Sequence, residues 1–221
     1  MIRRNATHFL ILAPVCLLTF AVPAVAQQAM SQEKSAVTAL EAILAETRTL
    51  SAEVDQLFMD QDGRELQEKR AMLLMEKPAR FRWSVTEPYE ELEITDGETY
   101  WRYEPDLEQV TIQSFDDNVD RTPIMLLNGD ADTISAAYDV SSTNLGGGLV
   151  RFVLIPSNPD RLFERLSVTF NGPVIEEMQF EDSLGQQTSM TFHDVQRNIP
   201  IDADQFSFTP PADIDVIDSR E

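Results

Sequence analysis

From Arg80 onward the chain is divided into short alternating segments by turn residues, and this spacing constrains the fold more than any other feature. Phe81 to Val85 alternates apolar and polar side chains and stops at Pro88. Segments of the same kind follow at 91–95, 99–103, 108–114, 137–143, 149–156, 166–171, 174–181 and 187–196. Strands of this length, joined by hairpin turns, predict an antiparallel β meander.

One of these connections is the pair Asp96-Gly97. Both residues tolerate positive φ, so we expect a two-residue hairpin turn here. Further connections are expected at 104–106, at 146–148, at Asn171-Gly172 and around Gly185.

Two elements precede the meander. Residues 33–46 carry an apolar stripe at spacings of three and four, which predicts a helix; its members are Ala36, Val37, Leu40, Ile43 and Leu44. Leu50, Ala52, Val54 and Phe58 occupy even positions with Glu53 and Asp55 between, which favours a strand, although the composition also fits a helix.

Residues typical of the start and the end of a helix occur within eight positions at 122–129, between predicted strands. Thr122 can cap the helix, Pro123 suits its first turn, and Gly129 suits a left-handed exit. Four apolar residues lie between Pro123 and Asn128, so a helix this short must pack against other apolar groups. A core plug is favoured over a lid on these grounds alone.

The amino terminus is typical of an export signal. Arg3 and Arg4 precede an apolar run over 9–22, and Ala24-Val25-Ala26 supplies small residues for cleavage after Ala26. A retained membrane anchor is the alternative, but the run is shorter than the ~20 residues that a spanning helix needs. We therefore expect residues 1–26 to be removed and 27–221 to form one domain outside the cytoplasm.

The single cysteine, Cys16, lies inside this apolar run. A lipidated cysteine needs a small residue before it, whereas Val15 precedes Cys16 and Leu17-Leu18 continue the run. After cleavage no cysteine remains, so no disulfide is available and burial alone must hold the domain together.

The formal net charge of the chain is −21, and only three lysines are present: Lys34, Lys69 and Lys77. Such a surface repels nucleic acid and anionic lipid, so neither is expected as a partner. Salt screens the self-repulsion of an acidic surface, which predicts greater stability in molar salt than in dilute buffer.

The residues give little support to an enzyme. His193 is the only histidine after the predicted cleavage, and no nucleophile triad, metal-ligand cluster or phosphate-binding glycine loop is evident. The acidic stretch 213–218 is interpreted as a solvated tail. Twelve phenylalanines and eight methionines instead favour binding of an irregular apolar ligand, with no cofactor and no metal.

Residues 77–110 carry motifs that together resemble one family. Lys77-Pro78 precedes Phe81-Arg82-Trp83, and Ile94–Gly97, Trp101–Tyr103 and Pro105–Val110 follow in order. The chain is similar there to the outer-membrane lipoprotein carrier protein (LolA) family. The likeness continues through Leu50–Gln56, Thr122-Pro123 and Phe206–Pro211.

The resemblance implies an open, incomplete antiparallel β-barrel, mainly β with short α-helices, whose mouth is covered by a helical lid. It implies a periplasmic, monomeric carrier that takes acylated lipoproteins from an inner-membrane ABC transporter. Their acyl chains are shielded in an apolar cavity and passed to an outer-membrane receptor. On this basis 122–129 is interpreted as a lid rather than a plug.

Candidate residues for the acyl cavity follow from the resemblance: Val54, Phe81, Trp83, Leu92, Ile94, Ile124, Met125 and Leu127. Ordinary core packing is the alternative for each of them. Family members commonly carry arginine where this chain has Lys77, and that arginine holds the lid through hydrogen bonds to helix backbone. Lysine lacks the planar fork of arginine, so we expect fewer bonds and easier opening.

Three other functions compete with the carrier. The receptor of the same pathway needs a lipobox cysteine, and a sensor with a fold of this kind needs a second domain beyond 27–221. A carrier for another amphiphile, such as a glycolipid or free fatty acid, stays open.

Overall fold

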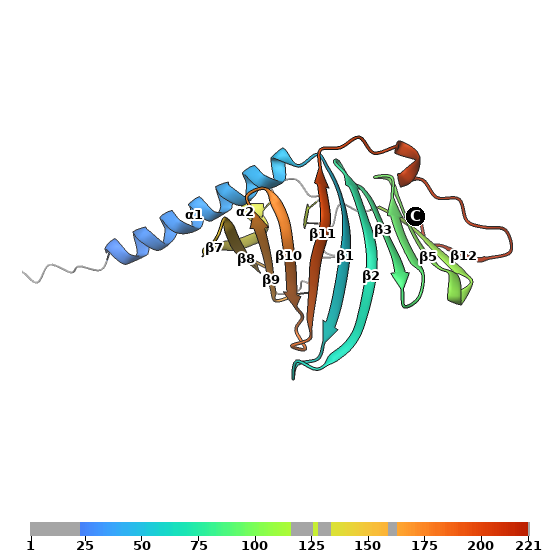
Figure 1. The fold of residues 1–221 in the computed structure, drawn as a ribbon, viewed down its shortest axis with the longest axis horizontal. Coiled ribbons are helices and arrows are strands. Elements are labelled where there is room, and N and C mark those ends of the chain that lie inside the picture. Colours follow the sequence, from blue (N-terminus) through green and yellow to red (C-terminus); the bar gives the residue numbers. More distant parts are fainter. Residues whose placement is uncertain (1–22, 116–125, 128–133, 159–162, 221) are drawn as a thin grey trace, which may run out of the picture.

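In a computed structural model of the chain, residues 23–115, 126–127, 134–158 and 163–220 are described, and the side chains from residue 33 onward. One curved sheet dominates the molecule (Figure 1). Its first six strands are β1 (Thr49–Met59), β2 (Glu65–Glu76), β3 (Arg80–Glu87), β4 (Glu91–Thr95), β5 (Thr99–Glu104) and β6 (Gln109–Ser114). The others are β7 (Tyr138–Gly146), β8 (Leu149–Pro156), β9 (Arg165–Asn171), β10 (Val174–Glu181), β11 (Gln187–Arg197) and β12 (Asp215–Asp218).

The sheet consists of two antiparallel meanders joined side by side, with β12 added in parallel to β6 at one end. The strand order is β12-β6-β5-β4-β3-β2-β1-β11-β10-β9-β8-β7, and β1 pairs with β11 to connect the halves. Strands β7 and β12 lie at the two ends of this order, so the described sheet is open rather than closed into a barrel. The predicted antiparallel meander is therefore confirmed, including the strand at Leu50–Phe58.

Helix α1 (Pro23–Glu46) runs along one end of the sheet (Figure 1) and packs against β7. Its buried side chains Ala36, Leu40 and Leu44 recur every four residues, which confirms the predicted stripe. The predicted cleavage after Ala26 falls inside this helix, and it stays a prediction. The short helices are α2 (Ile134–Ala137), η1 (Pro105–Leu107) and η5 (Ala203–Phe206).

The β4–β5 turn differs from the two-residue turn expected there. Thr95 and Tyr100 form the last pair, so four residues connect them. Only Gly97, at φ +102°, has positive φ; the Asp96 side chain instead accepts hydrogen bonds from the backbone N–H of Glu98 at 2.9 Å and Thr99 at 2.8 Å. These two hydrogen bonds to the carboxylate hold the turn in place of a second residue with positive φ.

Two strands were not expected. Strand β2 pairs along its length with β1 and, over Arg70–Glu76, with β3, although the sequence pattern predicted no element there. The solvated tail expected at 213–218 is wrong in part, because Asp215–Asp218 forms β12 and pairs in parallel with β6. All four of its residues are nevertheless exposed.

In the described residues, no helix is both long and apolar enough to cross a membrane.

Candidate functional site: the apolar inner face

The two faces of the sheet carry separate sets of buried side chains. We call the face that carries Leu73, Trp83 and Phe192 the inner face, because these residues belong to the main hydrophobic cluster together with Leu40 and Leu44 of α1. The opposite face is called the outer face. Side chains alternate between the two along every strand.

The inner face is apolar from β3 through β2, β1 and β11 to β7. Directly paired residues of neighbouring strands point to the same side, so Val54 of β1, Ala71 of β2 and Phe192 of β11 form one row across the sheet. Three methionines, Met75, Met178 and Met190, add adaptable apolar surface. Further buried members are Leu73, Phe81, Val85, Val140, Phe152, Leu154, Leu166, Val168, Phe170 and Ile175.

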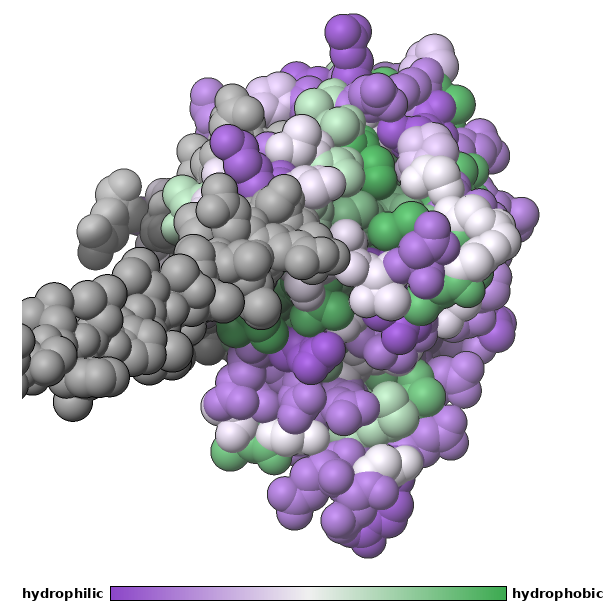
Figure 2. Space-filling view, turned by 90° about the vertical axis from the view of Figure 1, so that its left-hand side faces the viewer, coloured by the Kyte–Doolittle hydropathy of each residue, from purple (hydrophilic) through white to green (hydrophobic). Residues whose placement is uncertain are grey.

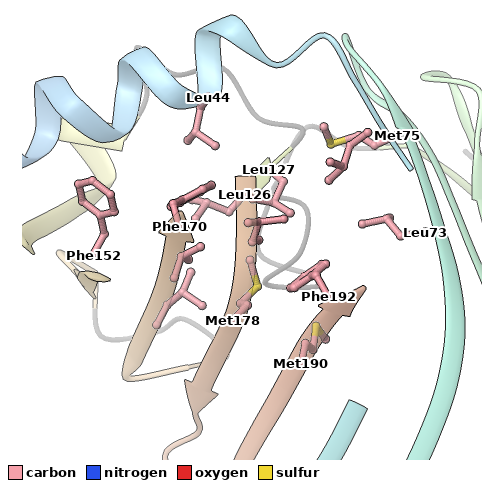
Figure 3. Close-up of a cluster of buried hydrophobic side chains, with 14 of the residues drawn as sticks. Leu44, Leu73, Met75, Leu126, Leu127, Phe152, Phe170, Met178, Met190 and Phe192 are labelled. Atoms are coloured by element: carbon pink, nitrogen blue, oxygen red, sulfur yellow. The ribbon is translucent and has the colours of Figure 1, made fainter. Parts of the chain in front are cut away.

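Helical segments, rather than a second sheet, cover this face. Figure 3 shows Leu44 of α1 pointing down toward the strands, with Leu126 and Leu127 between the side chains of β9–β11 and those of β2. Leu126 and Leu127 are each 3% exposed and belong to the main cluster. In this arrangement they fill the space that the curved inner face encloses.

The structure brings together half of the residues predicted to line a cavity. Val54, Phe81, Trp83 and Leu127 all belong to the main cluster beneath α1. That they contact acyl chains stays a prediction. Ile124 and Met125 lie outside the described residues.

Leu92 and Ile94, however, lie on the other side of the sheet. Trp83 pairs with Glu93, whereas Ile94 pairs with Arg82, so Trp83 and Ile94 point in opposite directions. Placing Leu92 and Ile94 in the cavity lining was therefore wrong. The apolar alternation of β4 was correct, but its register on β3 turns those residues to the outer face.

Ile94 instead belongs to a second core under the carboxyl-terminal segment. Trp101 pairs with both Ile94 and Ile112 on the outer face. Helix η5 packs against β3 there, its Phe206 is 1% exposed, and Arg82 donates a hydrogen bond to the Gln205 carbonyl at 3.1 Å. Phe206 and Phe208 of the family-like segment 206–211 thus pack on the outer face, Phe208 against Tyr103 with ring centroids 5.5 Å apart.

Lys77 lies in the turn between β2 and β3, next to the end of α1. Its Nζ donates a hydrogen bond to the Leu44 carbonyl oxygen at 2.9 Å, and its backbone N–H donates to the Arg48 carbonyl at 2.8 Å. Lys77 was expected to hold the lid, which the sequence placed at 122–129, whereas this bond goes to the backbone of α1. Its role as a lid lock stays a prediction.

The inner face becomes polar toward β4 and β5. Glu93, opposite Trp83, accepts a hydrogen bond from the Tyr100 hydroxyl. Burial, followed by the neighbouring Glu91 carboxylate, raises the pKa of Glu93 against the opposing influence of Tyr100 and Arg102. Burial and Glu93 together raise the pKa of the Tyr100 phenol above its ordinary value.

Two groups of inner-face residues were missed from the sequence. Met190 and Phe192 could have been found, because they alternate with polar residues in the segment 187–196. Leu73 and Met75 could not, because β2 carried no recognisable strand signal. Among the described residues, no group of three or more His, Cys, Asp or Glu could hold a metal ion.

The surface seen from the α1 side is mostly hydrophilic, with smaller hydrophobic areas between the charged side chains (Figure 2). This agrees with a chain of net charge −21 whose large apolar side chains face inward.

Comparison with known proteins supplies the family. The family model of the outer membrane lipoprotein carrier protein LolA matches residues 45–209. An outer-membrane lipoprotein carrier protein from Pseudomonas aeruginosa (strain UCBPP-PA14) is 41% identical over 192 residues, covering 87% of this chain and 92% of the relative. One from Azotobacter vinelandii is 38% identical over 201 residues, covering 91% and 96%.

A solved structure supports the fold. The crystal structure of an uncharacterized conserved protein from Thermus thermophilus aligns with a TM-score of 0.51 at 15% identity, covering 88% of this chain and 99% of that one. With the open sheet, the matched region and the identity to the carriers, the chain belongs to the LolA family of outer-membrane lipoprotein carrier proteins.

Proposed function

We propose that this chain is a periplasmic carrier that binds the acyl chains of lipoproteins on its inner face. It takes lipoproteins from an inner-membrane ABC transporter and gives them to an outer-membrane receptor. It acts by binding and release rather than by catalysis, as a monomer.

One observation carries the proposal. From β3 to β7 the inner face of the open sheet is a continuous apolar surface, and α1 and Leu126–Leu127 cover it instead of a second sheet. Helical segments of this kind can be displaced without breaking strand pairing. Each methylene removed from water contributes about 0.8 kcal/mol, so an acyl chain placed there would be held firmly.

Release follows from the same packing. We call closed the arrangement described above, in which α1 and Leu126–Leu127 lie on the inner face. In this closed state Leu126 and Leu127 occupy the surface that the acyl chains would contact. Closure and cargo therefore compete for one surface, and a partner protein that favours the closed state would expel the cargo. A carrier needs this balance, because tight binding alone would prevent transfer.

Release of a radiolabelled lipoprotein from spheroplasts tests the proposal. Purified protein, cut after Ala26, is added in increasing amounts and the labelled lipoprotein in the supernatant is measured. We expect release in proportion to the added carrier, and none with buffer alone. If the supernatant stays unlabelled while the protein still binds free fatty acid, a carrier for another amphiphile replaces this proposal.

A further inference from the structure

A groove opens at the end of the inner face that lies away from the Lys77–Leu44 bond. It has a volume of about 290 Å³ and is formed by the first half of β2 and by the β3–β4 and β5–β6 turns. Its lining residues are Gln67, Lys69, Pro88, Tyr89, Glu90, Glu91, Glu104, Asp106 and Leu107.

The groove continues the apolar surface described above. Val85 belongs to the main cluster and pairs directly with Glu91, which lines the groove. Strand β3 spans about 23 Å from Arg80 to Glu87, at about 3.3 Å per residue. Over that length the inner face changes from apolar to charged. This order fits a ligand whose apolar part is joined to a polar part.

The charge of the groove is strongly negative. Its lining holds four carboxylate side chains and one ammonium group. That ammonium, Lys69 Nζ, lies 2.8 Å from Glu91, and the neighbouring Arg102 lies 3.0 Å from Glu91 and 3.1 Å from Glu104. The cations Lys69 and Arg102 are thus already paired with carboxylates, while Glu90 and Asp106 are exposed at the rim of the groove.

Two apolar side chains stand beside these carboxylates. Tyr89 is 67% exposed and Leu107 is 66% exposed. Lysine and arginine pack their aliphatic stems on apolar surface while their charged ends reach an acidic partner, and an aromatic face attracts the cation itself. Apolar walls with a carboxylate rim therefore complement a cationic peptide better than an anionic or purely apolar one.

We infer that this groove binds the first residues of the lipoprotein polypeptide, directly after the acylated residue, and that it prefers cationic residues there. The inference rests on the proposed function, since the acyl chains on the inner face would bring the peptide to the groove. It adds a preference among lipoproteins that the acyl chains alone cannot provide.

Synthetic triacylated lipopeptides test the preference. Three peptides share the acylated cysteine and a serine, and end in four lysines, four glutamines or four glutamates. Their dissociation constants are measured with the full protein cut after Ala26, at low salt and in 0.5 M salt. We expect the lysine peptide to bind about tenfold more tightly than the glutamate peptide at low salt, with the ratio falling in 0.5 M salt.

Two matched double variants distinguish the effect of the groove carboxylates on peptide binding from the effect of the protein's overall negative charge. Glu90→Gln with Asp106→Asn removes two carboxylates from the rim. Glu53→Gln with Asp139→Asn removes two exposed carboxylates from the outer face. Because each exposed ion pair contributes modestly, we expect the rim variant to reduce the lysine-to-glutamate ratio about threefold to tenfold and the outer variant to leave it within about twofold.

The outcomes distinguish the two proposals. Equal effects of the two double variants, or no effect of either, would overturn the inferred groove while leaving the carrier function intact. Absence of binding by the glutamine peptide would instead overturn the carrier function itself.

Discussion

Lys77 Nζ donates a hydrogen bond to the carbonyl oxygen of Leu44 across 2.9 Å, joining the β2–β3 turn to the last turn of α1. The last carbonyl groups of a helix have no partner within it, and that of Leu44 accepts this bond together with one from the Thr47 backbone N–H at 3.2 Å. The bond holds α1 against the end of the sheet, over the apolar inner face.

Replacing Lys77 with leucine should impair transfer more than binding. Loss of a hydrogen bond from a charged donor lowers the stability of the closed state by about 1.5 kcal/mol, which is roughly a tenfold change in population. Closure then expels cargo less readily, so Lys77→Leu should still bind lipoprotein but transfer it poorly to the receptor. Transfer is measured as labelled lipoprotein received by receptor-containing liposomes.

Lys77→Arg is the matched control, because it keeps a donor at the same position and offers more N–H groups to the helix end. It should transfer at least as well as the native protein. Undiminished transfer by Lys77→Leu would show that the bond to Leu44 has only a local structural role.

The two tryptophans of the chain, Trp83 and Trp101, lie on opposite faces of the sheet. A lipopeptide with brominated acyl chains should therefore quench Trp83 strongly and Trp101 little. Single-tryptophan variants, Trp101→Phe and Trp83→Phe, report each residue separately. Equal quenching of both would place the acyl chains somewhere other than the inner face.

This difference between the faces shows what the sequence could and could not predict. Alternation along β3 and along β4 predicted that Trp83 and Ile94 are each buried. Which face each one occupies depends on how many residues connect the strands, because moving the register by one residue turns every side chain to the other side. The structure pairs Val85 with Glu91, and that register separates Ile94 from Trp83.

Strand β2 shows a second limit to prediction from local sequence patterns. Its sequence over Glu65–Glu76 is rich in Glu, Gln, Lys, Leu and Met, which favour helices, and residues 65–68 are exposed. Pairing with β1 on one side and β3 on the other overrides that preference. Likewise, the parallel pairing of β12 with β6 joins segments about a hundred residues apart in the sequence, and no local pattern encodes it.

A comparison of two alanine variants tests whether Leu127 moves aside when cargo binds or belongs to the permanent core. Leu127→Ala and Leu154→Ala both shorten a buried side chain of the main cluster, so each should lower the free energy of unfolding by about 2–5 kcal/mol. Leu154 lies on β8 and stays in place when helical segments move.

Only Leu127→Ala should therefore raise the affinity for a triacylated lipopeptide, because it destabilises the closed state that competes with cargo. Chemical denaturation and lipopeptide titration measure the two effects. A loss of stability with no gain in affinity would assign Leu127 to a permanent core.

Glu93 should make stability depend on pH. Burial, reinforced by Glu91, raises its pKa in the folded protein above the value of an unfolded chain. An acid with a raised folded pKa contributes most stability below its unfolded pKa, about 4.3, and loses that contribution as pH rises through the folded value. The ionised carboxylate is therefore unfavourable in the folded protein at neutral pH.

Glu93→Gln keeps the shape and removes the charge, so it should be more stable than the native protein at pH 7–8, by on the order of 1 kcal/mol. The gain should disappear as pH falls toward about 4, where the native carboxyl is protonated in both states. Urea denaturation at several pH values measures it. Glu98→Gln, in the exposed β4–β5 turn, is the control and should change stability by less than about 0.5 kcal/mol at every pH. A Glu93→Gln variant that is less stable at pH 8 than at pH 4, relative to the native protein, would mean that the bonds of the ionised carboxylate outweigh its burial.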